Sequence, residues 1–425
     1  MSDAAFFPVE SLIAAPIASA EVKDGHSLLR WMAALCLGGY GLVSFLPGLF
    51  GVEGRTFTVP FRALVLIMSL ACLWIYRKRF IATNCLRFFL AFWTIYTGRI
   101  LLDTVLNPIP LVLPVGDYWL NAYGIGVIPG IAFCILGSES DYSFLRRFLT
   151  VAWASVSALS LAFGDWSLGG SGRLTGNEYL NPITNGHIAA GLLLLCVYYL
   201  FGKKKTFAGM VFTLCCIPLG FFTLLAANSR GPIICAVVAA GILIFVGFRG
   251  RTRFAVMLLG LVLYAVFPNV IAQLQDQGEG QTISDRMGNL GDEGSLKDEA
   301  RYLTYAAAWA GYIDNPVFGY RFELPSSLIA SGEGAYPHNI LLESLMSTGT
   351  VGTILLVGLL GLSVRSAWRL LRDQRPNSWV SLLFIQYFVG AMFSGGIYND
   401  AELWHCCLAV TTLDAFFSRQ TPKLS

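Results

Sequence analysis

The sequence predicts an all-α polytopic membrane protein of about twelve transmembrane helices, and three observations support this fold class. Hydrophobic residues make up 55% of the 425 residues and charged residues only 13%. Soluble domains average about 25% charged residues, so this chain lacks the charge needed for a water-covered surface. The apolar segments are close to twenty residues long, which suits membrane helices better than the shorter strands of a barrel. The third observation is an alternation of basic residues between the connections.

Twelve apolar segments are each long enough to cross a hydrocarbon layer of ~30 Å. We expect spans at residues 28–50, 58–76, 83–106, 118–136, 144–163, 184–201, 207–227, 230–248, 252–274, 338–362, 378–397 and 400–418. The chain then divides into a cytoplasmic tail (1–27), nine spans (28–274), a large loop (275–337), three spans (338–418) and a second cytoplasmic tail (419–425). The first tail lacks the basic residues that begin a signal peptide, so we do not expect a signal peptide there.

The basic residues lie mostly in alternate connections between the predicted spans. One set of connections carries 20 of the 29 Lys and Arg residues, including the lysine run 203–205, and the other set carries seven. The remaining two, Arg62 and Arg99, fall within spans. Because Lys and Arg are retained on the cytoplasmic side, both termini are predicted to be cytoplasmic and the loop at 275–337 periplasmic. The lysine run is explained by orientation and anionic lipid, and we expect no nucleic-acid partner.

The loop at 275–337 is the longest polar connection in the chain. Within it, residues 297–314 are predicted to form a helix, because Tyr302, Tyr305 and Trp309 recur at helical spacing. The Asn-Pro pair that follows should end this helix. Long loops in membrane and soluble domains are usually functional or disordered, and a helix with an aromatic face argues against disorder. We therefore expect the chemistry of the protein at this loop.

Three residues at the outer face carry that expectation. His338 lies where the loop re-enters the membrane, and imidazole can remove a proton at neutral pH; a simpler alternative is that His338 or Asn339 only caps the next helix. Arg230 follows a long apolar helix, and Arg301 begins the loop helix. Each arginine could instead be a headgroup contact or a solvated charge. Together, two guanidinium groups and one imidazole suit the displacement of a diphosphate leaving group without a metal.

The chain from Arg301 to Gly352 resembles the shared domain of the O-antigen ligase and O-antigen polymerase superfamily. The residues that carry the resemblance are Arg230 in its Ser-Arg-Gly turn, Arg301, Trp309, Asn315-Pro316-Val317-Phe318-Gly319, His338-Asn339, Leu342-Glu343, Gly349 and Gly352. The predicted topology, with one large outer loop, agrees with that superfamily along nearly the whole chain.

The resemblance implies a metal-independent, inverting glycosyltransferase of the bacterial inner membrane that needs no cofactor and acts on the periplasmic side. The donor would be an undecaprenyl-diphosphate-linked oligosaccharide, and the acceptor a lipid-linked glycan or lipid A-core. By this analogy Arg230 and Arg301 hold the diphosphate, and His338 activates the acceptor hydroxyl. The substrate-binding residues expected beside them are Arg286, Arg321, Trp309, Tyr336, Asn339 and Glu343. The resemblance also allows for membrane lipids and a chain-length regulator protein as partners.

Two activities fit this resemblance. A polymerase would join O-antigen or exopolysaccharide repeat units, whereas a ligase would move finished glycan onto lipid A-core or onto a protein. The run at 336–343 looks more like polymerase relatives, which favours the first. A transporter or flippase for lipid-linked sugars is the alternative from a different class. Transporters tend to contain internal repeats, and this sequence shows no convincing one.

The other polar groups have simpler interpretations. Arg99 and Asp103 lie four residues apart on one predicted helix, where mutual pairing is expected. Asp400, Glu402 and His405 cluster at the start of the last span and are expected to be structural or to line a cavity. The acidic residues of the large loop lack an Asp-x-Asp arrangement, so no metal site is predicted. The ten cysteines lack zinc-site spacing and are expected to pack as small apolar side chains.

Overall fold

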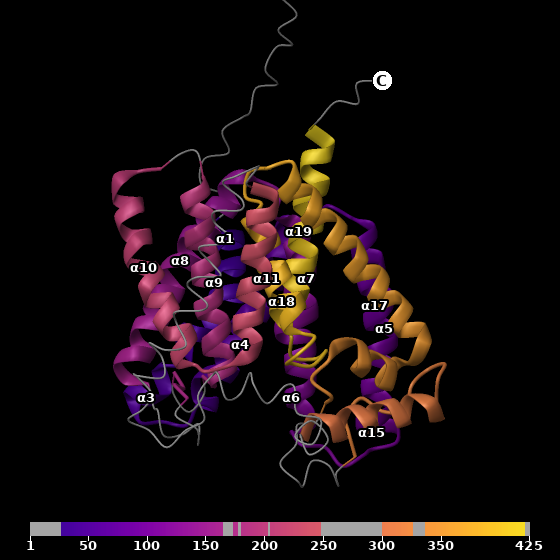
Figure 1. Cartoon of the computed structure of the whole chain (residues 1–425). Helices are drawn as coiled ribbons and strands as arrows, with labels where there is room; N and C mark the ends of the chain where they lie inside the picture. Colours follow the sequence, from indigo (N-terminus) through magenta and orange to yellow (C-terminus); the bar gives the residue numbers. More distant parts are fainter. Residues whose placement is uncertain are drawn as a thin grey trace, which may run out of the picture.

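The computed structural model describes residues 27–164, 173–176, 180–202, 205–247, 300–325 and 336–420, and these residues form an all-α bundle without a β-strand (Figure 1). The helices before the large loop are α1 (Ser27–Ala34), η1 (Leu35–Gly39), α2 (Tyr40–Val43), α3 (Leu46–Phe50), α4 (Arg55–Ile75), η2 (Arg77–Arg79), α5 (Asn84–Leu101), η3 (Leu102–Leu106), α6 (Val115–Trp119), η4 (Leu120–Val127), α7 (Ile128–Ala132), η5 (Phe133–Ile135), α8 (Glu139–Phe163), α9 (Pro182–Phe201), α10 (Phe207–Ala226) and α11 (Arg230–Gly247). The later helices are α15 (Ala300–Asp314), α17 (Ile340–Arg372), α18 (Trp379–Gly390) and α19 (Ala401–Gln420).

Helices occupy eleven of the twelve predicted spans, and the ninth, at 252–274, lies outside the described residues. Seven helical stretches of the described chain are long and apolar enough to cross a membrane. They are α4, α5 with η3, α6 through η5, α8, α9, α10 and α17. Shorter apolar helices cover residues 27–43, 230–246 and 379–390. These lengths and compositions are those of a multi-pass membrane protein.

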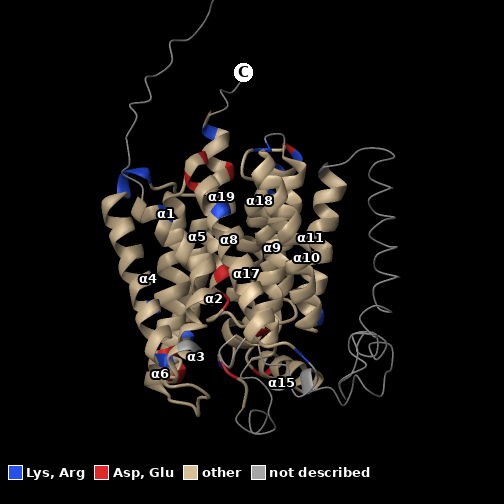
Figure 2. Cartoon of the chain, turned by 90° about the vertical axis from the view of Figure 1, so that its left-hand side faces the viewer, with Lys and Arg blue, Asp and Glu red and all other residues tan. Residues whose placement is uncertain are grey.

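The two ends of the bundle differ in charge. The helix α15 lies at one end, and α19 finishes at the opposite end (Figure 1). Lys and Arg residues gather at the end of the bundle where α19 finishes (Figure 2). The asymmetry in three dimensions thus follows the alternation seen along the sequence.

Short polar side chains mark several helix starts. Each accepts a hydrogen bond from a backbone N–H in the first turn, as Thr83, Ser138, Asn181 and Thr206 do. Such caps contribute about 1 kcal/mol each because they satisfy an otherwise unpaired donor. The loop helix α15 ends at Asp314, one residue before the Asn-Pro pair, as the sequence predicts. Nine of the ten cysteines are buried and Cys215 is exposed, which agrees with their predicted role as packing residues.

The helix α17 is broken where the sequence predicts a continuous span. Its backbone leaves the helical region at Gly349, with φ 64° and ψ −162°. A Cβ there would lie 2.4 Å from the carbonyl carbon and oxygen of Val317, so only glycine permits this approach. The freed N–H of Thr350 donates to the carbonyl of Pro316 at 2.8 Å. The break therefore docks the segment after α15 directly onto α17.

The buried pair of Arg99 and Asp103 fastens the same segment to α5. Their side chains lie 3.3 Å apart, as predicted. The Arg99 guanidinium donates to four backbone carbonyls at 2.8–3.2 Å, those of Phe318, Gly319, Tyr320 and Ser347. Asp103 accepts from the N–H of Phe322 at 2.9 Å. A charged side chain inside an apolar helix is energetically costly. Here the bonds that Arg99 and Asp103 make to the segment after α15 offset that cost.

The predicted eleventh span is too long at its end. The helix α18 stops at Gly390, whereas the sequence predicts a span to residue 397. Residues 391–400 form an irregular segment with a left-handed glycine, Gly395, at φ 86°. A Cβ on Gly395 would lie 2.1 Å from the Asp400 carboxylate, so glycine is required there. Irregular backbone between apolar helices is tolerated where it is buried in protein or lines a cavity.

Candidate functional site

The start of α17 is fixed by Asn339. Its Oδ1 accepts from the N–H groups of Leu341 and Leu342 at 3.1 and 3.0 Å, and its Nδ2 donates to the carbonyl of Met392 at 3.2 Å. Asn339 is therefore the helix cap, and His338 is not needed for that purpose. The cap also binds α17 to the irregular segment that follows α18.

His338 stands immediately before this cap in a left-handed backbone conformation, with φ 53°. Such a conformation is uncommon for a residue with a side chain and is often found at functional sites. The ring of Tyr336 packs edge-on against the imidazole, with ring centroids 4.8 Å apart. Asn399 donates to the Tyr336 hydroxyl at 3.4 Å. Burial raises the pKa of Tyr336 to about 12, so its phenol remains a proton donor at neutral pH.

Glu343, one turn into α17, is a fully buried carboxylate. Both of its oxygens accept from the N–H of Ile397 at 3.0 Å, and Tyr96 donates to it at 3.3 Å. These bonds connect α17, α5 and the irregular segment before α19. The carboxylate is thus engaged in holding three parts of the fold together, and it does not line the cavity described next.

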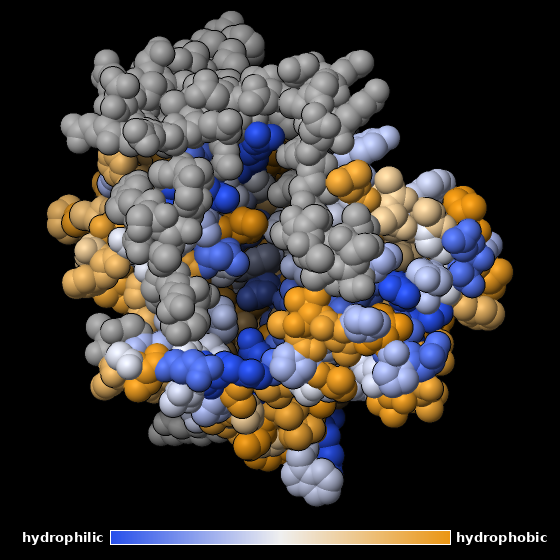
Figure 3. Space-filling model, turned by 90° about the horizontal axis from the view of Figure 1, so that it is seen from below, coloured by the Kyte–Doolittle hydropathy of each residue, from blue (hydrophilic) through white to orange (hydrophobic). Residues whose placement is uncertain are grey.

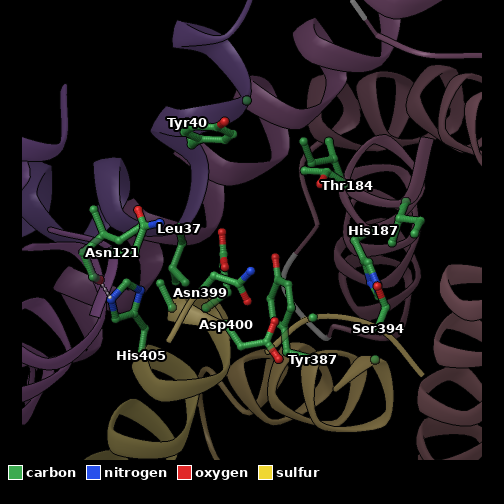
Figure 4. Close-up of a pocket in the computed structure, with 18 of the residues that line it drawn as sticks. Leu37, Tyr40, Asn121, Thr184, His187, Tyr387, Ser394, Asn399, Asp400 and His405 are labelled. Atoms are coloured by element: carbon green, nitrogen blue, oxygen red, sulfur yellow. Dashed lines mark hydrogen bonds between the residues drawn. The ribbon is translucent and has the colours of Figure 1, made fainter. Parts of the chain in front are cut away.

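A cavity of about 510 Å³ lies between the helices beside His338. Its walls come from η1, α4, η4, α9, α18, the irregular segment and α19. Figure 4 shows polar side chains around it, with Asn121 and His405 on one side and Thr184 and His187 on another. The face of the molecule at the α15 end is hollowed at its centre, and hydrophilic residues lie within the hollow (Figure 3). A volume of this order is typical of ligand sites.

Three histidines line this one cavity: His187, His338 and His405. His187 packs beside Tyr387, with ring centroids 6.1 Å apart. His405 is 1% exposed, and its Nε2 lies 2.7 Å from the carbonyl oxygen of Ile125. Only His338 of the three adjoins the large loop. His338 is therefore the histidine of this cavity that follows directly on the end of the large loop.

The cavity also contains charged side chains from within the bundle. Arg62 of α4, Asp400 and Glu402 all line it. In the described part of the chain, no three His, Cys, Asp or Glu side chains are grouped in a way that could hold a metal ion. The site therefore consists of imidazole, carboxylate and guanidinium groups around one cavity, which suits binding and proton transfer.

The predicted arginines, unlike His338, are not among the described residues that line the cavity. Arg230 is partly buried as the first residue of α11, and it is not one of the described residues that line the cavity. Arg321 follows α15 and stacks on Tyr320, with its guanidinium carbon 4.7 Å from the ring centroid. Arg301 lies in the first turn of α15, and its side chain is outside the described part. Arg286 lies outside the described residues altogether.

Of the predicted aromatic residues, Tyr336 lines the cavity and Trp309 does not. The Trp309 side chain is 51% exposed on α15 and packs against Tyr312, with ring centroids 5.3 Å apart. Its place on the outer surface of the loop helix leaves it open to a ligand that approaches from the α15 end.

The predicted site residues did not include Arg62, Asn121 or His187. Arg62 did carry a signal, because an ionised side chain inside a membrane span is expensive and usually functional. His187 carried a weaker one, as one of only four histidines in the chain. Asn121 carried none, since a single amide in a glycine-rich segment has no distinctive spacing. Asp400, Glu402 and His405 were predicted to be structural or cavity-lining, and they line the cavity.

Comparison with known proteins gives one positive result. Residues 215–357 match the family model described as O-antigen ligase. The match covers about a third of the chain and includes α11, α15, His338 and the break at Gly349. A comparison with curated individual proteins finds no match.

Proposed function

We propose that this chain transfers lipid-linked glycan at the periplasmic face of the bacterial inner membrane. The match of residues 215–357, which points to the O-antigen ligase and polymerase superfamily, supports this proposal. The donor is an undecaprenyl-diphosphate-linked oligosaccharide, and the transfer inverts the anomeric configuration without a metal. The observation that carries the proposal is the position of His338. It lies inside the matched segment, between the large loop and a polar cavity enclosed by membrane helices.

His338 acts as the general base in this proposal. A hydroxyl oxygen of the acceptor attacks the anomeric carbon of the donor, and His338 takes the hydroxyl proton. A new glycosidic C–O bond forms while the bond to the diphosphate breaks, and undecaprenyl diphosphate leaves with its electron pair. Support comes from the left-handed backbone of His338 and from the Tyr336 ring, which orient the imidazole.

Arg230 and Arg301 bind the departing diphosphate in the same scheme. Their guanidinium groups would neutralise charge that grows as the bond to phosphorus-bound oxygen breaks. Support is indirect: both belong to segments that the family match covers, one at the start of α11 and one in the first turn of α15. Arg286 and Arg321 are the further candidates for this contact.

The acceptor is a second lipid-linked repeat unit in our first proposal, which makes the protein a polymerase. The run at 336–343 supports this choice by its likeness to polymerase relatives. The second candidate is ligation of finished glycan to lipid A-core or to protein, and the match of residues 215–357 to the O-antigen ligase family supports it. Acceptor choice depends on the shape of the binding site, so an assay decides between them.

The test uses purified full-length protein in detergent or nanodiscs, with lipid-linked repeat units as the donor and a chelator present. We expect longer glycan chains with repeat units alone, or a glycosylated core when lipid A-core is added. His338→Ala should lower the rate by about 10²–10⁴-fold, the usual contribution of a general base, and should retain the wild-type melting temperature. Translocation of the lipid without any new glycosidic bond would instead identify a transporter.

A further inference from the structure

Some of the buried polar atoms that lack a hydrogen-bond partner in the described part of the chain lie at the cavity. Five of them belong to side chains that line it: Arg62 Nε, Asn121 Oδ1, His187 Nδ1, Asp400 Oδ2 and His405 Nδ1. In folded proteins such atoms are nearly always paired, because leaving one unpaired costs the full price of removing it from water. A ring of them around one space indicates a polar occupant.

Asn121 and His405 make this argument strongest because they have little other access to solvent. Their residues are 8% and 1% exposed. Both side chains stand at the cavity from one wall, and Asp400 lies beside them on the irregular segment (Figure 4). These three side chains come from η4, from α19 and from the segment between α18 and α19, so the fold brings them together from distant parts of the chain.

The unpaired atoms are mostly acceptors. The amide oxygen of Asn121 and the carboxylate of Asp400 can only accept while Asp400 is ionised. His405 faces a carbonyl oxygen with Nε2, and a carbonyl only accepts, so Nε2 holds the proton. Its Nδ1 is then an acceptor in the neutral ring. The occupant must therefore supply several donors, and Arg62 Nε requires an acceptor from it as well.

A diphosphate does not meet this demand. Its oxygens are acceptors at neutral pH, so they would leave the Asn121 amide oxygen and His405 Nδ1 without a donor. Sugar hydroxyls meet it directly, because each one donates and accepts at once. Tyr336 and Tyr387 in the same wall offer aromatic faces against which the apolar side of a sugar ring can pack.

We infer that this cavity is a sugar subsite, in which Asn121, Asp400 and His405 bind hydroxyl groups of the glycan while the diphosphate stays outside. The inference rests on the proposed function. It adds that the sugar binds inside the bundle, whereas the diphosphate binds near the arginines. His338, which also lines the cavity, then lies beside the bound sugar. The sugar comes from the acceptor or from the donor, and the experiment separates these two sources.

The test measures binding, which does not require turnover. The probes are undecaprenyl diphosphate without sugar, the lipid-linked repeat unit, and the free repeat-unit oligosaccharide. The variants are Asp400→Asn and Asn121→Ser, with Asp373→Asn as the matched control. Asp373 is a carboxylate at the far end of α17 that pairs only with its neighbour Arg372 at 3.0 Å in the described structure. Melting temperatures of all proteins are recorded, and Asn121→Ser serves if Asp400→Asn does not fold.

We expect Asp400→Asn to weaken binding of the repeat unit, lipid-linked or free, about 10-fold or more, since the amide nitrogen cannot accept a hydrogen bond as the replaced carboxyl oxygen does. Binding of undecaprenyl diphosphate should stay within about 2-fold of wild type, and Asp373→Asn should match wild type for every probe. With a lipid-linked oligomer as the donor and a single lipid-linked repeat unit as the acceptor, a raised KM for the acceptor alone, at saturating donor, identifies the acceptor sugar. A raised KM for the donor alone identifies the donor sugar.

Two results would overturn the inference. Weaker binding of undecaprenyl diphosphate and of the lipid-linked repeat unit, with unchanged binding of the free oligosaccharide, would place the diphosphate in the cavity. Unchanged binding of every probe would leave the cavity to water alone. Either result leaves the proposed function standing if the wild-type protein transfers glycan. An inactive wild-type protein that still binds repeat units through Asp400 would instead remove the transferase assignment and keep the sugar site.

Discussion

At the scale of single residues, three kinds of side chain are expected to contact different parts of the substrate. In the proposed mechanism, His338 takes the proton, the carboxylate and amide groups of the cavity bind hydroxyls, and guanidinium groups bind phosphate. The sequence predicted the first and third of these roles from chemistry and sidedness. It could not predict the second, because Asn121 and Asp400 lie nearly 280 residues apart in the chain and meet only through helix packing.

Arg230→Lys tests the phosphate role. Lysine keeps the charge but loses the planar fork that binds two phosphate oxygens at once. We expect kcat/KM for the lipid-linked donor to fall about 10-fold or more, which corresponds to about 1.4 kcal/mol, while the protein remains folded. Steady-state kinetics with saturating acceptor measures this. Full activity of the lysine variant would reduce Arg230 to a contact with lipid headgroups.

At the scale of elements, the broken helix α17 is the feature that organises the site. The sequence predicted a helix that begins near residue 338 and a loop helix that ends at Asp314. Both are present. It did not predict the break at Gly349. A glycine within an apolar run usually only weakens a helix, and its close contact with Val317 depends on the fold of the loop.

Gly349→Ala tests the break. The backbone of Gly349, with φ 64° and ψ −162°, lies in a region essentially restricted to glycine, where alanine costs about 1–3 kcal/mol, and the 2.4 Å approach to Val317 adds a clash. We expect a lower unfolding temperature and loss of glycan transfer. Gly361→Ala on the same helix is the control, because nothing lies within 4 Å of its added methyl group. That control should be neutral or slightly stabilising, and equal effects of both variants would argue against the break as a docking point.

The hydrogen bonds from Arg99 to the segment after α15 lead to a second prediction at the scale of elements. Arg99→Gln should free the segment at 318–322, because it removes charge-assisted bonds to four carbonyls. Hydrogen exchange of the amides in this segment should become faster, and glycan transfer should fall. Arg87→Gln is the control, since Arg87 is exposed on α5 and bonds only Asn84 among the described contacts, at 3.4 Å. Unchanged protection in Arg99→Gln would show that the segment holds itself in place.

At the scale of the whole molecule, composition and charge pattern predicted most of the architecture. A helix occupies each predicted span that the structure describes, although the eleventh ends early at Gly390, and the basic end of the bundle lies opposite α15. The sequence could not predict the cavity, because each wall is an ordinary apolar helix with one or two polar residues. Such residues become a site only when several helices turn them toward the same space.

Membrane sidedness is open to a direct test. In intact cells with a permeable outer membrane, Asp314→Cys at the exposed end of α15 should react with an impermeant maleimide. Gln420→Cys, at the end of α19, should react only after the inner membrane is opened. Both are made in a Cys215→Ser background, because Cys215 is the exposed native cysteine. The reverse labelling pattern would place the large loop, and His338 with it, on the cytoplasmic side.

The most direct measurement of the central claim is an experimental structure of the protein with a bound lipid-linked repeat unit. We predict the sugar in the cavity beside His338, in contact with Asp400 and Asn121, and the diphosphate outside it against Arg230 or an arginine of the large loop. A diphosphate bound among the carboxylates of the cavity, or a ligand seated at the opposite end of the bundle from α15, would contradict the account.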